Sequence, residues 1–189
     1  MKTILAFVSV LILPISLLGQ ASPKLLISNT PLTTDQIAIY RIFLFSYDPG
    51  LETPINVADT TSEFSPESND LKSCLKEFGS SVSPQKLHRF TAEFSDFQNI
   101  HLIDPNTHKI SDPEIAIKRG ESIDQAVKAG VEAGVLTLSE VIFDSTHHFA
   151  AFSYSFRCGV LCGSGGTVVY EFNNGKWIKS KRFCSLWMS

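Results

Sequence analysis

The chain has 189 residues, of which 43% are hydrophobic and 19% are charged. This composition excludes a disordered tail, a collagen-like repeat and a dense disulfide miniprotein. The formal net charge of −3 gives no bulk attraction to nucleic acid, so no nucleic-acid partner is expected. The length fits one domain or at most two small ones.

Residues 1–21 have the pattern of an export signal. A positive start is followed by an apolar run over 4–18, and small residues precede an expected cleavage point after Ala21. The alternative is a membrane anchor, but the run is short for a span and Pro14 breaks it. We therefore expect a single domain over 22–189, without a membrane span, in the periplasm or outside the cell.

The first part of this domain is expected to be mainly helical. Thr33 and Gln36 form a capping box, and the segment 48–69 is rich in Pro, Ser, Thr and acids and is expected to be irregular. A short strand is expected over 100–103. Helices are expected over 34–47, over 70–78, between Asp112 and Gly120, and between Ser122 and Gly134. The expected buried face of the last helix consists of Ile123, Ala126, Val127, Gly130 and Val131.

After this helix the apolar period changes from 3.6 to 2. Strands are expected over 136–143, 148–158, 167–172 and 177–187, with Asn174-Gly175 as a type I′ hairpin turn. In the second strand one face carries Ala150, Phe152, Tyr154, Phe156 and Cys158. Short connections favour antiparallel pairing. The sequence thus predicts an α+β fold, in which N-terminal helices pack on a C-terminal four-stranded antiparallel meander.

The C-terminal third also carries a series of short motifs: Leu138-Ser139-Glu140, Ser153-Tyr154-Ser155-Phe156, Cys158-Gly159-Val160-Leu161-Cys162-Gly163, Gly166 and Asn174-Gly175-Lys176-Trp177. Together they resemble a group of exported bacterial proteins with a Cys-Gly-x-Leu-Cys-Gly motif near the C-terminus. The resemblance extends over most of the chain and is strongest over 134–189. It implies export and a single domain. The group has no known activity, so the resemblance transfers no catalytic residue.

Four cysteines in an exported chain suggest disulfides, for which three connectivities exist. We favour Cys158–Cys162, which closes a short loop, and Cys74–Cys184, which ties the second helix to the last strand. One alternative is a redox pair at the first two positions, although their spacing differs from a thioredoxin-like motif. The other is a zinc site made of Cys158, Cys162, Cys184 and His147 or His148. No metal or other cofactor is expected.

The segment Gly163-Ser164-Gly165-Gly166 raises the alternative of a serine nucleophile. It lacks the Gly-x-Ser-x-Gly pattern of a nucleophile elbow, and no sequence around His88, His101 or His108 supplies a matching base. We interpret the segment as a glycine-rich turn beside a disulfide.

Bases and aromatic residues gather in the last expected strand. Alternation along 177–187 places on one face Trp177, Lys179, Lys181 and Trp187, together with Phe183. This surface is a candidate for binding a partner, and the alternative is that the lysines protect an edge strand from aggregation. The sequence thus favours an exported, non-enzymatic binding module for an unknown protein, glycan or small molecule. The alternative function is a thiol, metal or serine-dependent enzyme centred on 158–166.

Overall fold

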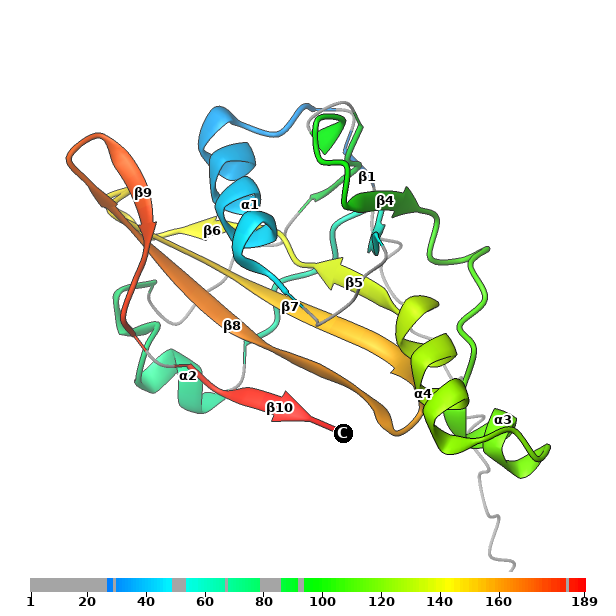
Figure 1. Cartoon of the computed structure of the whole chain (residues 1–189). Coiled ribbons are helices and arrows are strands. Elements are labelled where there is room, and N and C mark those ends of the chain that lie inside the picture. Colours follow the sequence, from blue (N-terminus) through cyan, green and yellow to red (C-terminus); the bar gives the residue numbers. More distant parts are fainter. Residues whose placement is uncertain are drawn as a thin grey trace, which may run out of the picture.

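A mixed eight-stranded β-sheet forms the centre of the molecule (Figure 1). The computed structural model describes residues 27–28, 30–48, 54–66, 68–78, 86–91, 94–182 and 184–189. Neighbouring strands follow the order β10-β8-β7-β5-β2-β4, with β6 beside β7 and β9 beside β8. These strands are β2 (Ile55–Ala58), β4 (Ile100–Ile103), β5 (Val135–Leu138), β6 (Ile142–Phe143), β7 (Phe149–Gly159), β8 (Cys162–Asn173), β9 (Lys176–Lys179) and β10 (Leu186–Met188). The predicted α+β class is confirmed.

The sheet is larger than the predicted four-stranded antiparallel meander. Strands β5, β7, β8 and β9 do pair antiparallel in that order. Strands β2 and β4 extend the sheet by parallel pairing, with β2 between β4 and β5. The prediction that 48–69 is irregular was wrong at β2, because a strand of four residues is too short to show a clear alternation. The meander is therefore one part of a mixed sheet.

The single strand predicted over 177–187 is two strands in the structure. Strand β9 pairs with residues 170–173 of β8, and β10 pairs with residues 164–166 of the same strand. Between them, Cys184 is buried and bonded to Cys74. The connection is thus held at Cys184, and pairing with β8 is interrupted between β9 and β10.

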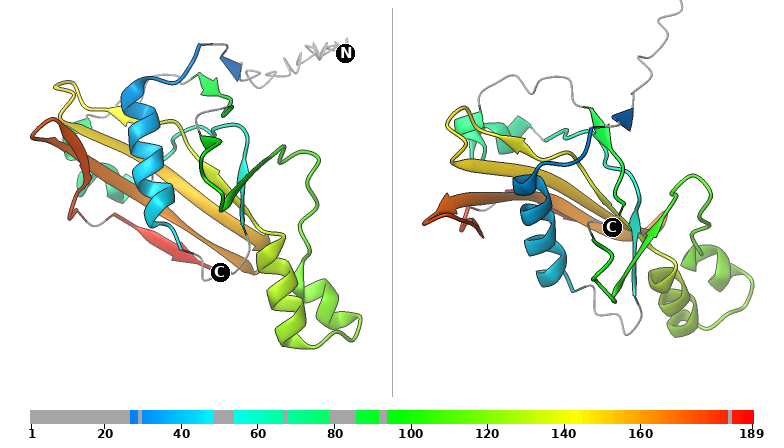
Figure 2. Two further views of the ribbon diagram at one scale, coloured as in Figure 1. Left: turned by 45° about the horizontal axis from the view of Figure 1, so that its top comes forward. Right: turned by 90° about the horizontal axis from the view of Figure 1, so that it is seen from above.

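Helix α1 (Thr34–Ser46) lies across one face of the sheet (Figures 1 and 2). The predicted capping box is confirmed, because the Thr33 hydroxyl accepts from the Gln36 N–H and the Gln36 side chain accepts from the Thr33 N–H. Tyr40 is fully buried, meets three aromatic rings edge to face, and donates its hydroxyl to the Ser139 carbonyl at 2.7 Å. These contacts close the main core between α1 and the central strands.

The opposite face is partly covered by α2 (Ser68–Lys72) and a 3₁₀ turn, η1 (Lys76–Phe78) (Figure 2). A continuous helix over 70–78 was predicted, but the Leu75 N–H donates to the Asp70 carbonyl five residues earlier, which ends the α-helical pattern. A second small core lies beneath this segment. It contains Phe64, Cys74, Leu75, Ala151, Val169 and Cys184. A separate parallel pair joins β1 (Ile27–Ser28) to β3 (Leu87–His88).

Helices α3 (Pro113–Lys118) and α4 (Ile123–Glu132) stand together at one end of the sheet (Figure 1). They begin at the predicted caps, where the side chains of Asp112 and Ser122 accept backbone N–H groups. The short α3 is followed by Gly120, whose φ of 96° is readily adopted by glycine. The local sequence therefore determines the N-caps of both helices and the end of α3.

The predicted buried face of α4 is only partly buried. Ala126 and Gly130 are buried, whereas Ile123 and Val127 are 65% and 43% exposed. The reason is that α4 packs against α3 instead of lying across the sheet. A Cβ on Gly130 would come within 2.4 Å of Pro113.

The expected export signal over 1–21 and its cleavage point lie outside the described residues. Within the described part of the chain, no helix is both long enough and apolar enough to cross a bilayer. The longest helix within the described residues, α1, has 13 residues, whereas a membrane span needs about 20.

Candidate ligand-binding trough

The four residues of the predicted binding surface do not share one face: Trp177, Lys179, Lys181 and Trp187. Trp177 lies opposite Phe172 of β8, whereas Trp187 lies opposite Gly165. These two β8 positions are an odd number of residues apart, so alternation directs the two indoles to opposite faces. The lysines are exposed on β9 and in the loop after it. The shared-face prediction was wrong because it assumed one uninterrupted strand.

Trp177 anchors helix α1 to the sheet. Its indole N–H donates to the Asp35 carboxylate at 3.0 Å, and His147 Nε2 lies 2.9 Å from the other carboxylate oxygen. The hydrogen bonds from His147 and Trp177 hold the pKa of Asp35 below its ordinary value. The His147 ring stacks on Phe143 with 4.2 Å between centroids. Trp177 is thus occupied with structural contacts.

Both predicted disulfides are present, Cys74–Cys184 and Cys158–Cys162. All four cysteines of the chain are therefore paired, and the three cysteines of the zinc alternative belong to two different bridges. Within the described residues, the one cluster with metal-ligand spacing joins Asp70 to Cys74 and Cys184, and these two cysteines are bonded to each other. This geometry gives no support to a thiol or metal centre.

Ser164 does not have the surroundings of a nucleophile. Residues 163–166 belong to strand β8, so the prediction of a glycine-rich turn was wrong. The Ser164 side chain lies beside Tyr47, whose pKa burial raises to about 12. No described histidine hydrogen-bonds to Ser164, so the serine-nucleophile alternative gains no base from the structure.

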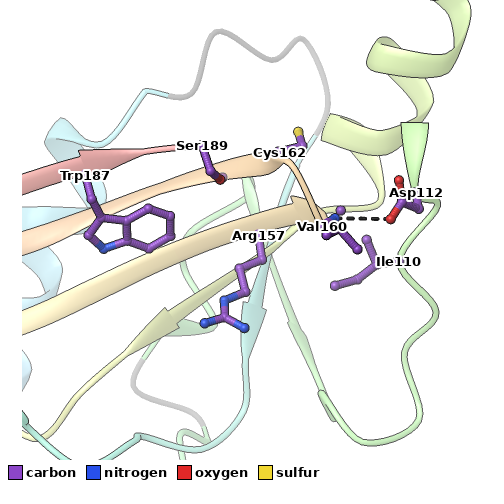
Figure 3. A pocket seen from close by; sticks show the side chains of 9 residues that line it. Ile110, Asp112, Arg157, Val160, Cys162, Trp187 and Ser189 are labelled. Atoms are coloured by element: carbon purple, nitrogen blue, oxygen red, sulfur yellow. Dashed lines mark hydrogen bonds between the residues drawn. The ribbon is translucent and has the colours of Figure 1, made fainter. Parts of the chain in front are cut away.

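On the face opposite α1, two adjoining hollows share Arg157 and Trp187, and we call the pair the trough. Figure 3 shows the larger hollow. The volumes of the two hollows are about 570 and 290 Å³; ligand pockets usually measure about 300–1,000 Å³. The larger hollow extends to the β7–β8 turn and is also lined by Ile110, Asp112, Gly159, Val160, Cys162, Gly163 and Ser189. The smaller has mainly hydroxyl groups, on Ser62, Ser65, Thr137, Ser153, Ser155, Thr167 and Ser185.

Trp187 forms one wall of the trough and is seated on glycines. A Cβ on Gly165 would lie 2.6 Å from the indole nitrogen of Trp187, and one on Gly163 would lie 3.4 Å from its six-membered ring. The indole therefore lies over both glycines, and at Gly165 it leaves no room for a Cβ. With 39% of its surface exposed, Trp187 keeps an accessible aromatic surface. The packing of Trp187 thus explains why β8 contains glycines here, which the sequence alone did not indicate.

Arg157 is the positive group of the trough. It alternates with Phe156 and Cys158, which are buried on the α1 face, so its side chain lies on the trough face (Figure 3). Its guanidinium makes no hydrogen bond or ion pair with any described residue. Sequence reasoning missed Arg157, although its place in the polar half of the β7 alternation was a usable signal.

Some of the remaining polar groups of the trough already form hydrogen bonds within the protein, and others do not. Asp70 accepts from the Ser185 N–H and hydroxyl at 2.8 and 2.7 Å, and Asp112 accepts from the N–H groups of Glu114 and Val160. In contrast, the buried Ser155 hydroxyl has no hydrogen-bond partner within the described structure. The carboxylates are thus satisfied, while Arg157 and Ser155 retain unused hydrogen-bonding capacity.

A second polar cluster escaped the sequence analysis. The buried Glu140 carboxylate accepts from the His88 N–H at 3.0 Å, lies 2.9 Å from His88 Nδ1, and accepts from the Thr61 hydroxyl. These residues are far apart in the sequence, so no local pattern predicts that they form a cluster. They join the β3 segment to the end of β5 and satisfy one another, which is a structural role.

No family model, curated protein or solved structure matches this chain. A functional assignment therefore depends on the site itself. The trough combines a guanidinium, an indole and a row of hydroxyls on an accessible sheet face. Such a set can hold a polar ligand by hydrogen bonds and ring packing.

Proposed function

We propose that the protein is an exported, non-enzymatic binding protein whose ligand occupies the trough. The observation that carries this proposal is Arg157, a guanidinium without a partner among the described residues, placed where two hollows meet beside Trp187. An arginine that folding leaves unpaired at the junction of two hollows is available to a ligand.

Binding is favoured over catalysis by the state of the other groups. The two carboxylates of the trough already accept backbone N–H groups, and the cysteines nearby form a disulfide. A general base or a nucleophile would need a group that is available to the substrate. The disulfides and the expected signal over 1–21 together support export, because disulfides persist in oxidising compartments.

The test is a thermal-shift screen of sugars, organic acids, amino acids and phosphates, followed by titration of the hits. We expect a ligand to change the fluorescence of the half-exposed Trp187 more than that of the buried Trp177. The Trp187→Phe and Trp177→Phe variants each retain one tryptophan, so they show which indole gives the signal. Trp187→Ala should weaken binding by at least about tenfold, because aromatic anchors dominate such sites.

The matched control is the double variant Lys179→Ala, Lys181→Ala, which leaves the trough intact. It should bind as the wild type does. If this control loses the ligand while Trp187→Ala keeps it, the binding surface lies on β9 and the following loop, and the trough proposal is wrong.

A further inference from the structure

Resting on the proposed function, we infer that the ligand of the trough is a short acidic oligosaccharide whose uronic-acid carboxylate binds Arg157. The inference combines three features: one cation, one exposed indole, and a floor of hydroxyl groups. Each excludes a different class of small ligand.

The charge of the trough fits a single carboxylate. Arg157 is the only cation among the described residues that line the two hollows, and the carboxylates of Asp70 and Asp112 already accept hydrogen bonds from Ser185 and Val160. A planar guanidinium matches a carboxylate through two parallel hydrogen bonds. A phosphate dianion would bring a second negative charge that no further described cation of the trough meets.

Trp187 fits a sugar ring. Its indole is held by Gly163 and Gly165 from below and remains 39% exposed, so a flat aromatic surface is presented in a fixed position. The C–H face of a pyranose packs on such a surface while the ring hydroxyls point outward. The indole N–H also has no hydrogen-bond partner among the described residues, so it can donate to a sugar oxygen.

The floor of the smaller hollow fits a hydroxyl-rich molecule. Ser155 and Trp187 both lie opposite Gly165, and Thr137 lies opposite Ser155, so these side chains form one row across the sheet. The Ser155 hydroxyl has no partner within the described structure. A fatty acid or another apolar anion would leave these groups unpaired, which carries a cost when they are buried.

The two hollows extend beyond a single sugar unit. The Trp187 ring reaches Gly163, which pairs with Arg157 on the next strand, so the indole and Arg157 lie about one strand spacing (~5 Å) apart. A sugar ring on Trp187 can therefore place its own carboxylate at Arg157. The two hollows continue on either side.

The experiment compares trigalacturonate with its methyl ester, which has the same rings without the charge, by calorimetric titration of the full exported protein. We expect the wild type to bind the acid about 10- to 100-fold more tightly than the ester. Arg157→Gln should remove this preference, Arg157→Lys should retain part of it, and Trp187→Ala should weaken both ligands. Arg157 is exposed, so its variants should fold, and circular dichroism checks this.

Other outcomes overturn the inference without ending the proposed function. If the ester binds as tightly as the acid, or if Arg157→Gln keeps the preference, the carboxylate assignment is wrong. If citrate or inorganic phosphate displaces trigalacturonate at equal affinity, the ligand is a simple anion and the sugar assignment is wrong. If no acidic sugar binds but another compound from the screen depends on Trp187, only the ligand class fails. If no compound depends on Trp187, the proposed function fails too.

Discussion

Asp35 joins helix α1 to two separate hairpins. Its carboxylate accepts the Trp177 indole N–H of β9 and contacts His147 in the β6–β7 turn. The pKa of Asp35 is lowered in the fold, chiefly by the hydrogen bond with His147 and then by the one from Trp177. A carboxyl whose pKa is lower in the folded state stabilises the fold above its unfolded pKa of 3.8. This contribution is lost as the pH falls through the folded pKa.

For Asp35→Asn we therefore expect a pH-dependent loss of stability. The side chain of Asp35 is 40% exposed, so solvent screening limits its contribution to at most ~1 kcal/mol. Urea unfolding should show the wild type more stable than the variant at about pH 5, with a smaller difference at about pH 3, below the unfolded pKa of 3.8. An equal difference at both pH values would mean that the charge of Asp35 does not contribute.

His147→Asn is the matched control for this prediction. His147 has a φ of 56°, and asparagine tolerates this left-handed conformation, so the turn is preserved. Because His147 is the largest cause of the lowered pKa of Asp35, the variant should remove most of the pH dependence. Retention of the full pH dependence would assign it to another carboxyl group.

The two disulfides close loops of very different length. Cys74 and Cys184 are 110 residues apart, whereas Cys158 and Cys162 are 4 apart. In the chain-entropy model the long loop contributes about 4–5 kcal/mol to stability and the short one about 2. Urea unfolding of Cys74→Ala, Cys184→Ala should thus show the greater loss of unfolding free energy.

The second double variant, Cys158→Ala, Cys162→Ala, is the comparison for the first. Both pairs include buried cysteines, so the packing changes are similar in kind. If the short pair costs as much as the long pair, packing at the β7–β8 turn outweighs the loop entropy.

The elements that sequence reasoning recovered are those fixed by local signals. Thr33 with Gln36, Asp112 and Ser122 mark helix starts in the sequence and in the structure. Asn174 and Gly175 have φ values of 49° and 78°, as the predicted type I′ turn requires. Each of these features is decided within a few residues.

The elements that it missed depend on distant partners. Strand β2 exists because β4 and β5 pair with it, and β10 exists because Gly163, Gly165 and Gly166 of β8 leave room beside and beneath it. Neither condition is visible in the four or three residues of the strand itself. The glycines of 163–166 predict a turn because glycines are typical of turns, whereas the indole that packs on them belongs to a strand two strands later in the chain.

Across the whole molecule, the two faces of the sheet differ in chemistry. The α1 face holds the aromatic core, including Phe152 and Phe156 of β7, as the alternation predicted. The other face carries Ser153, Ser155 and Arg157 from the same strand and includes the trough. The sequence shows both halves of this alternation, but it cannot show how much of the polar face stays uncovered. That depends on where α2 and β10 pack against the sheet.

The same aromatic core makes the fold sensitive to alkaline pH. Burial raises the pKa of all four tyrosines of the chain: Tyr40, Tyr47, Tyr154 and Tyr170. An acid whose pKa is higher in the folded state stabilises the fold below its unfolded pKa of 10.0, and this stability is lost as the pH rises further. Each such group removes up to about 1.4 kcal/mol of unfolding free energy per pH unit, so four groups remove at most about 5.6 kcal/mol per pH unit.

A small domain with about 5–15 kcal/mol of stability should then unfold cooperatively within a few pH units above 10. Tyrosinate absorbance should rise together with the loss of near-ultraviolet circular dichroism, and early ionisation in a folded protein would contradict the prediction.

The Tyr170→Phe variant tests this further, because the buried Tyr170 hydroxyl has no hydrogen-bond partner among the described residues. This variant should be as stable as the wild type or more stable by about 1 kcal/mol at neutral pH. Above pH 10 its unfolding free energy should fall less steeply, by about 1.4 kcal/mol per pH unit, because one ionisable group is gone.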